Sequence, residues 1–288
     1  MKSVQYLFVA VIGISMISCQ KSYNPPDLVI PPGGGTTPPA TGGGSQLSKM
    51  VVSEKNNNST YTYQYDGNGR LSDATMDALI SGQTLKSSWH FVRDNSGKLL
   101  QYLVKNNTQF FPAAGITYTF HYLPGSSTVA YQSASYDIFG LTQKDSIVFS
   151  YANGKVSGYT SYTDYANSGY EASVKFTYVY DSNGNLIDEK EYGMGVNPSP
   201  DLVATTTYEY DDKNNALQLG FESYVLGVGR YFSKNNPTKT INTFYGPSSI
   251  DKYTTVISYQ YNSANKPVSA VATDPAASGS PGTITYTY

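Results

Sequence analysis

Tyr63-Gln64-Tyr65-Asp66-Gly67-Asn68-Gly69-Arg70-Leu71 is the stretch of sequence that decides the fold. Alternating tyrosines end in an Asp, a turn rich in Gly and Asn follows, and a Leu opens the next segment. Alternation with a period of two is typical of a β-strand that buries one face. Because Asn, Asp and Gly supply the positive-φ positions of tight hairpins, the stretch predicts two antiparallel strands joined by a short turn.

The same unit recurs along the chain from residue 47 onward. Close copies lie at 91–99 and 178–186, and the last position of the aromatic row before each turn falls at 65, 93, 122, 151, 180, 210, 261 and 288. A period of about 29 residues suits two strands of about ten residues plus two connections. The longer gap between 210 and 261 is expected to hold an irregular unit around 231–240. We therefore expect an all-β antiparallel hairpin meander of roughly 14 strands.

The two faces of these strands differ in character. One face carries aromatic or aliphatic side chains at almost every position, as at Tyr61, Tyr63 and Tyr65, whereas the other carries residues such as Thr62 and Gln64. Such a pattern indicates a sheet with one buried face and one wet face. A transmembrane barrel would instead need a lipid-facing band of Leu and Val with aromatics confined to two girdles. Since an open meander would leave its edges exposed, we expect a closed or nearly closed water-soluble β-barrel with a Tyr-rich inner face.

Composition narrows the range of partners. The 288 residues include 28 tyrosines and a single Cys, and the formal net charge is −2. This chain lacks the basic field that holds a phosphate backbone, so we expect no nucleic-acid partner. A single Cys forms neither an internal disulfide nor a thiolate metal cluster. We expect a monomer without a metal or other cofactor.

Residues 1–18 are predicted to be a lipoprotein signal peptide. Lys2 gives a basic start, and the apolar run that follows is about twelve residues long, too short to span a bilayer as a helix. Met16-Ile17-Ser18-Cys19 resembles a bacterial lipobox, and this resemblance implies cleavage before Cys19 and lipidation of its thiol. Gln20 is not the Asp that resembles an inner-membrane retention signal, which favours the outer membrane. Whether the protein faces the periplasm or the cell surface stays open.

A tether follows the leader. Residues 19–46 comprise the lipidated Cys and a segment rich in Pro and Gly, which buries almost nothing and is expected to be disordered. The folded hairpin-repeat domain is then expected over 47–288. The tether would hold this domain clear of the lipid headgroups.

Together, the lipobox, the Pro/Gly tether and the Tyr-Asp hairpins resemble uncharacterised Gram-negative lipoproteins with a domain of unknown function of porin-like β-barrel fold. The segment at 232–239, Phe-Ser-Lys-Asn-Asn-Pro-Thr-Lys, resembles a late element of that family, and the closing Tyr-Thr-Tyr at 286–288 resembles its last strand. The resemblance implies a fold and a location but no chemistry. The Tyr-Asp-x-x-Gly-x-Leu pattern is also similar to the YD repeats of Rhs-type shell proteins. No activity carries over from them, because nothing in the chain resembles a toxin or a self-cleaving site.

Motifs for nucleophilic or metal chemistry do not stand out. Gly-x-Ser-x-Gly does not occur. His90 and His121 fall on the polar face of neighbouring repeats with a return strand between them, too far apart to share a zinc ion. The segment 181–185, Asp-Ser-Asn-Gly-Asn, alternates acidic and amide groups as calcium loops do, but it departs from the calcium-loop pattern further on. A hairpin turn in which Asp caps its own backbone explains these residues better.

Acidic residues at 188–191 suggest a carboxylate pair of the kind that cleaves glycosides. On a strand, however, Asp188 projects opposite to Glu189, and we interpret Asp188, Glu189 and Glu191 as solvated charges. We therefore expect that the protein is not an enzyme.

The tyrosine rows allow two interpretations. Tyrosine is a β-forming residue that can build the core of a wide sheet, and stacked aromatic faces also bind sugars and amphipathic molecules. The candidate ligand-lining residues are Tyr63, Tyr65, Trp89, Phe91 and Arg93. Of these, Arg93 is a charge on the inward face, and it would be costly to bury without a partner.

These observations lead to one hypothesis with two alternatives. The first is a non-enzymatic, outer-membrane-anchored lipoprotein that binds a glycan or an amphipathic small molecule of the cell envelope. The second is a structural or adhesin-like envelope protein that uses its polar outer face or its turn loops. The third, a glycan-acting enzyme, would need acidic residues that line a cleft.

Overall fold

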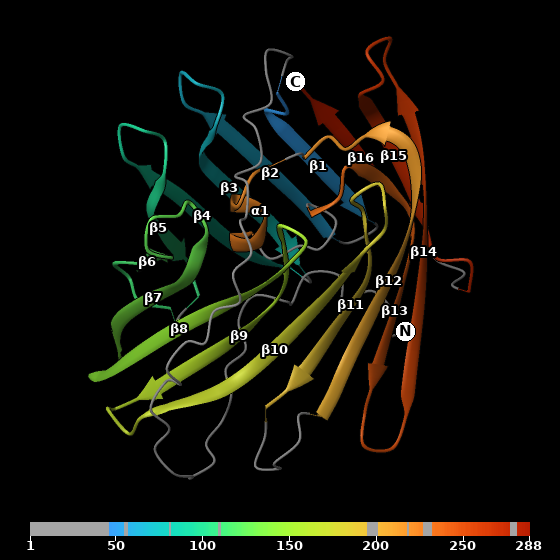
Figure 1. Ribbon diagram of the computed structural model, residues 1–288. Coiled ribbons are helices and arrows are strands. Elements are labelled where there is room, and N and C mark those ends of the chain that lie inside the picture. Colours follow the sequence, from blue (N-terminus) through green and yellow to red (C-terminus); the bar gives the residue numbers. More distant parts are fainter. Residues whose placement is uncertain are drawn as a thin grey trace.

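In a computed structural model, the chain forms a closed barrel of sixteen strands (Figure 1). The structure describes residues 46–54, 57–80, 82–108, 111–194, 201–217, 219–226, 232–276 and 281–288. Each strand pairs antiparallel with the next one along the chain, and β1 pairs with β16 to close the ring. Closure satisfies the backbone groups that an open meander would expose at its two edges.

One short helix interrupts the described strands, between β12 and β13. Within the described ranges, no helix combines the length and apolar character needed to cross a membrane. The bounds are β1 (Lys49–Glu54), β2 (Asn57–Tyr65), β3 (Leu71–Ile80), β4 (Gln83–Arg93), β5 (Leu99–Asn106), β6 (Ile116–Tyr122), β7 (Val129–Ile138), β8 (Leu141–Ala152), β9 (Lys155–Tyr165), β10 (Tyr170–Tyr180), β11 (Leu186–Gly193), β12 (Asp201–Asn214), α1 (Glu222–Val225), β13 (Asn235–Tyr245), β14 (Ile250–Tyr261), β15 (Pro267–Thr273) and β16 (Gly282–Thr287).

The predicted strand number is too low, although the predicted architecture is confirmed. The eight aromatic rows are the even-numbered strands, so the shortfall lies among their partners. β1 precedes the first tyrosine row and has no Tyr-Asp turn of its own, so the repeat does not reveal it. The gap between 210 and 261 holds an ordinary hairpin, β12 and β13, whose connection at 215–234 carries α1. The irregular unit expected around 231–240 is misplaced, because α1 lies earlier, at 222–225, and residues 235–240 belong to the regular strand β13.

The Tyr-Asp turns have the predicted chemistry. The side-chain Oδ1 of Asp66 accepts hydrogen bonds from the backbone N–H groups of Asn68 and Arg70, both at 2.9 Å. Gly69 closes the turn at a φ of 75°, which favours glycine. The turn at 94–98 repeats this arrangement around Asp94. Because a register shift precedes each such turn, the last residue of each aromatic row leans across toward the neighbouring hairpin.

This lean lets tyrosines bridge neighbouring hairpins. The hydroxyl of Tyr122 donates to the carbonyl of Leu99 at 2.6 Å, and that of Tyr151 donates to the carbonyl of Val129 at 2.7 Å. The same bond joins Tyr65 to Leu47, Tyr210 to Leu186, and Tyr288 to Pro267. Burial raises the pKa of Tyr122 to about 12, so its hydroxyl stays a proton donor near neutral pH.

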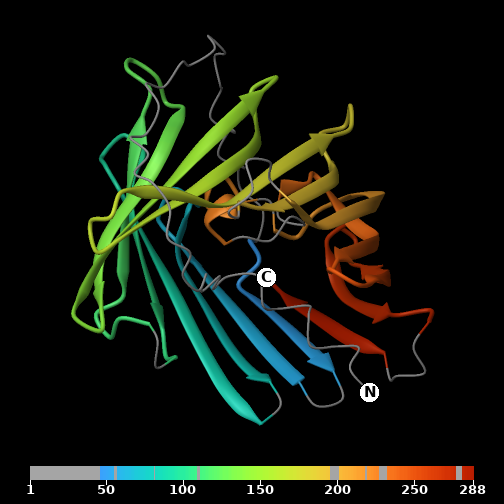
Figure 2. The same cartoon turned by 90° about the horizontal axis from the view of Figure 1, so that it is seen from below.

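The predicted inward face is confirmed. Tyr63 and Phe91 are each 4% exposed, and Phe120 is 6% exposed, so the aromatic rows form the core of the barrel. The segment with α1 fills one part of this interior, because the ring of Phe221 packs edge-on against Phe149 with 4.9 Å between centroids and also contacts Phe120. Figure 2 shows α1 within the ring of strands. We call the described residues from Leu219 to Leu226 the plug.

Candidate functional site

Arg93 ends β4 at the position that tyrosine occupies in most other repeats. Its guanidinium donates to the carbonyl of Leu71 at 3.4 Å, which is the counterpart of the bond from Tyr122 to Leu99, and to the carbonyl of Gly97 at 3.1 Å. Its Nη2 also forms an ion pair with Glu222 of the plug, and the two side chains are only 12% and 7% exposed. The structure thus gives Arg93 the partner that an inward charge requires.

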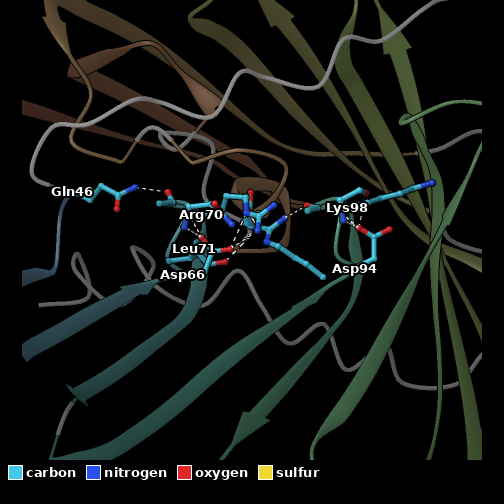
Figure 3. Close-up of polar contacts among 12 residues, drawn as sticks. Gln46, Asp66, Arg70, Leu71, Asp94 and Lys98 are labelled. Atoms are coloured by element: carbon cyan, nitrogen blue, oxygen red, sulfur yellow. Dashed lines mark hydrogen bonds and ion pairs between the residues drawn. The ribbon is translucent and has the colours of Figure 1, made fainter.

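Two neighbouring turns brace this end of the barrel (Figure 3). Arg70 pairs with Asp66 at 2.8 Å, and its guanidinium lies against Gly97 of the next turn, where an added Cβ would come within 1.5 Å of its Nη1. The side chain of Gln46 donates to the carbonyl of Gly69 and ties the start of the domain to the same layer. Burial and the nearby Arg70 lower the pKa of Arg93. The turn end is therefore a layer of fixed polar contacts around the plug.

The residues predicted to line a ligand lie in the packed core of the barrel or against it. Tyr63 and Phe91 belong to the buried core, while Tyr65 and Trp89 pack against it. Arg93 is bound to the plug. Their position shows a structural role, and a contact with a ligand stays a prediction for them.

A second group of inward side chains is acidic, and it includes two of the residues interpreted from the sequence as solvated charges. Glu189 lies opposite Tyr178 on one side and Thr206 on the other, and Glu191 lies two residues along the same strand. Both carboxylates therefore face the interior. Asp188 faces outward, as predicted, and forms an ion pair with Lys190 at 3.4 Å.

The electrostatic surroundings of these carboxylates are unusual. Burial, and to a lesser extent the neighbouring Glu191, raise the pKa of Glu189 to about 7, although a hydrogen bond from Tyr208 opposes the shift. Burial also raises the pKa of Glu191. Among the described residues, no lysine or arginine forms an ion pair with either carboxylate. A positive charge or hydrogen-bond donor placed between them would relieve their repulsion.

A third inward carboxylate lies on β8, three strands along the barrel from β11. Asp145 is 9% exposed and accepts hydrogen bonds from the hydroxyls of Tyr118 at 3.2 Å and Tyr136 at 2.6 Å. Nearby on β7, Gln132 donates to the hydroxyl of Tyr102 at 3.1 Å, while its own Oε1 is buried without a hydrogen-bond partner. The interior therefore offers acceptors on β7 and β8 as well as on β11.

Solvent reaches the wall formed by β11 to β14. Inward residues of β11 to β14, such as Glu189, Thr206, Asn242 and Thr255, are half-buried, in contrast to the buried Tyr63, Phe91 and Phe120 of β2, β4 and β6. The sequence did not predict this wall, because the aromatic pattern defines the inward side of the aromatic strands only and leaves the inward side of the return strands undefined. The alternation within β11 carried the signal, since Glu189 and Glu191 share one side of the strand.

The histidines and the calcium-loop-like segment considered in the sequence make ordinary structural contacts. His90 pairs with Asp73 at 2.7 Å and His121 contacts Ser133 at 2.9 Å, each on the outer face, with β5 between their strands. Asp181 receives hydrogen bonds from its own turn, from the backbone N–H and side-chain amide of Asn185, which supports a hairpin over a calcium loop.

No group of three or more His, Cys, Asp or Glu side chains within the described ranges could hold a metal ion. The predicted leader, the lipidated Cys19 and the tether up to residue 45 lie outside the described residues.

No protein-family model matches the chain, and no curated protein matches it. A porin-like protein from Bacteroides uniformis matches 84% of this chain and 97% of its own, at 14% identity and a TM-score of 0.50. A porin-like protein from Bacteroides vulgatus matches 85% of this chain and 99% of its own, at 16% identity and a TM-score of 0.51. The similarity to YD repeats stays a prediction. At this level of identity the likeness concerns the fold alone, and it agrees with the predicted porin-like β-barrel.

Proposed function

We propose that the protein is a non-enzymatic, lipid-anchored envelope protein that binds a small molecule inside its barrel. One observation carries the proposal: the inner wall of β11 and β12 carries the half-buried polar residues Glu189, Glu191 and Thr206, while the plug and the tyrosine core fill the turn end. A wall of polar acceptors beside aromatic rings is typical of a ligand site.

The geometry of the acids supports binding over catalysis. Glycoside hydrolases place two carboxyl groups on either side of the scissile bond. Glu189 and Glu191 instead lie two residues apart on one strand and point from the same wall. Asp145 is engaged by hydrogen bonds from two tyrosine hydroxyls and from Gln143. This arrangement can hold a ligand but does not flank a bond.

The proposed location rests on the lipobox-like Met16-Ile17-Ser18-Cys19 and the Pro/Gly-rich tether. We propose that lipid on Cys19 anchors the domain in the outer membrane. Metabolic labelling with a palmitate analogue tests the anchor: the native chain should carry label and sediment with membranes, and Cys19→Ser should do neither. Label retained by Cys19→Ser would contradict the proposal.

A blocking substitution tests the binding site. Thr206 faces the interior beside Glu189, whereas Thr207 lies next to it on the outer face, opposite Asp188. Native mass spectrometry of the protein purified from membranes should detect a bound small molecule, which Thr206→Trp should abolish and the matched control Thr207→Trp should retain. Equal occupancy in both variants, or none in the native protein, would overturn the proposal.

An adhesin-like role is the second candidate, and exposed apolar hairpin tips favour it. Phe139 is 77% exposed at the β7–β8 connection, and Ile250 is 66% exposed at the start of β14. Both lie at the end of the barrel opposite the Tyr-Asp turns. Envelope binding that survives Thr206→Trp but is lost in Phe139→Ser with Ile250→Ser would favour this role.

A further inference from the structure

The lysines of the described strands are confined to the outer face of the barrel, whereas carboxylates lie on both faces, as Asp77, Asp188 and Glu209 do on the outer one. Carboxylates face inward at Asp145, Glu189 and Glu191, and the strand register adds Glu54 and Asp251 to the same face. The lysines whose facing the register defines all lie on the outer face, namely Lys49, Lys86, Lys105, Lys144, Lys175, Lys190, Lys239 and Lys252. Outer carboxylates such as Asp77, Asp188 and Glu209 therefore pair with lysines, which the inner face of the described strands does not provide.

The interior keeps little positive charge of its own. Among the described strand residues whose facing the register defines, Arg93 is the inward basic side chain, and Glu222 of the plug already pairs with it. The inward carboxylates of β8 and β11 are thus left without a basic partner within the described ranges. A concave surface lined by one sign of charge concentrates ligands of the opposite sign.

An unfilled acceptor points to the same kind of ligand. Gln132 is 3% exposed and faces the interior, and its Oε1 lacks a hydrogen-bond partner. It lies opposite Ile147 on β8, two residues from Asp145 on the same inward row. A buried acceptor without a donor is costly, and a ligand with N–H groups would satisfy it.

Aromatic rings complete the surroundings of the acids. Tyr178 lies directly opposite Glu189, and the rings of Tyr159 and Phe176 lie close together, with 4.8 Å between their centroids. The faces of such rings attract cations. Carboxylates, an unfilled acceptor and ring faces therefore all favour a ligand that carries positive charge and N–H donors.

We propose that the barrel interior binds an aliphatic amine with at least two ammonium groups. The inference deepens the proposed function and rests on it. Ammonium groups supply positive charge to the inward carboxylates Glu189 and Glu191. They also supply a hydrogen-bond donor to the Oε1 atom of Gln132. A neutral glycan would supply hydroxyl donors but no positive charge for the inward carboxylates, which lack basic partners among the described residues.

Titration calorimetry at pH 8 with the protein expressed from its full sequence tests this proposal. The probes are spermidine, the neutral 1,8-octanediol, and maltotriose. Spermidine should bind and the neutral probes should not. Glu189→Gln with Glu191→Gln should weaken spermidine binding by about tenfold or more, since charged hydrogen bonds are lost. The matched control, Asp188→Asn with Glu209→Gln, removes as much charge from the outer face and should leave binding unchanged.

The outcomes separate the two proposals. A neutral probe that binds to the native protein and to the double variant Glu189→Gln with Glu191→Gln, but not to Thr206→Trp, would overturn the amine inference. This result would support the interior site. Equal loss of spermidine binding in the inward and outward variants would mean non-specific attraction and would also overturn the inference. Spermidine binding that Thr206→Trp leaves intact would place the site elsewhere and contradict both. Absence of binding by every probe would count against the amine inference, and the mass-spectrometric test would then decide on the interior site alone.

Discussion

Arg93 and Glu222 form a buried ion pair that joins the wall of the barrel to the plug. Arg93 achieves this while still making the bridge to Leu71 that a tyrosine makes in other repeats. Tyr180 departs from the tyrosine pattern in a related way, because its hydroxyl contacts that of Tyr224 in the plug at 3.2 Å. The plug is thus bound by Arg93 and Tyr180, two row-ending residues that depart from the common tyrosine bridge.

Removing one member of this pair should be more harmful than removing both. Glu222→Gln leaves Arg93 buried without its counter-charge, and we expect a loss of about 3–5 kcal/mol in the free energy of unfolding. Adding Arg93→Tyr restores the side chain found in other repeats and should recover at least about half of that loss. Urea denaturation followed by Trp89 fluorescence measures both values. Strictly additive losses would show that the pair is not coupled.

The tyrosine bridges should contribute individually to stability. Tyr122→Phe keeps the ring beneath the ammonium group of Lys98, 3.7 Å from its centroid, but removes the donor to the carbonyl of Leu99. We expect a loss of about 1–2 kcal/mol in the free energy of unfolding because that carbonyl loses its partner. Tyr131→Phe is the control, since Tyr131 stacks on His121 at the outer face. An equal effect of the two substitutions would argue against the bridge.

Much of this fold follows from the tyrosine repeat. The alternation predicted the inward rows, and Asp66 with Gly69 predicted the turn geometry, because both are local properties of a few consecutive residues. β1 was not predicted, since its pairing with β16 depends on closure of the whole ring. The plug was not predicted either, because its position depends on a contact between Arg93 and Glu222 across 129 residues.

The inward acidic residues Glu189 and Glu191 of β11 could be predicted only in part. The alternation of Glu189 and Glu191 is local and visible in the sequence, but their common face could point either way. The hairpin bulge between Val179 and Tyr180 fixes the choice by setting Glu189 opposite Tyr178. A bulge of one residue reverses the facing of every side chain beyond it. Bulges before the Tyr-Asp turns are thus what sequence reasoning would need to place the return strands.

Gly97 should tolerate no side chain. It adopts a φ of 91°, and an added Cβ would meet the guanidinium of Arg70. We expect Gly97→Ala to lower the free energy of unfolding by about 1–3 kcal/mol through backbone strain and this contact. Gly125→Ala is a matched control for the strain alone, since Gly125 has a φ of 67° and nothing lies within 4 Å of its added Cβ. Adding Arg70→Ala to Gly97→Ala should recover only the part due to the contact, and complete recovery would exclude strain.

The raised pKa of Glu189 predicts how stability depends on pH. Its pKa is about 7 in the folded chain against 4.5 for an ordinary glutamate, so the folded state holds a proton that the unfolded state has lost between these values. The free energy of unfolding should therefore fall as pH rises from about 4.5 to about 7 and should level off above. Because Glu189 is half-buried, we expect the contribution to be about 1–3 kcal/mol.

Glu189→Gln isolates this contribution, because Gln resembles the protonated side chain and does not titrate. The variant should match the native protein near pH 4.5 and exceed its free energy of unfolding by about 1–3 kcal/mol at pH 8, as measured by urea denaturation across the range. Asp188→Asn, on the outer face of the same strand, should not gain stability in this window. Spermidine at pH 8 should narrow the difference between native protein and Glu189→Gln, since the ligand would stabilise the ionised carboxylate only where it exists. A native protein that is equally stable at pH 5 and pH 8 would contradict the inward, desolvated position of Glu189.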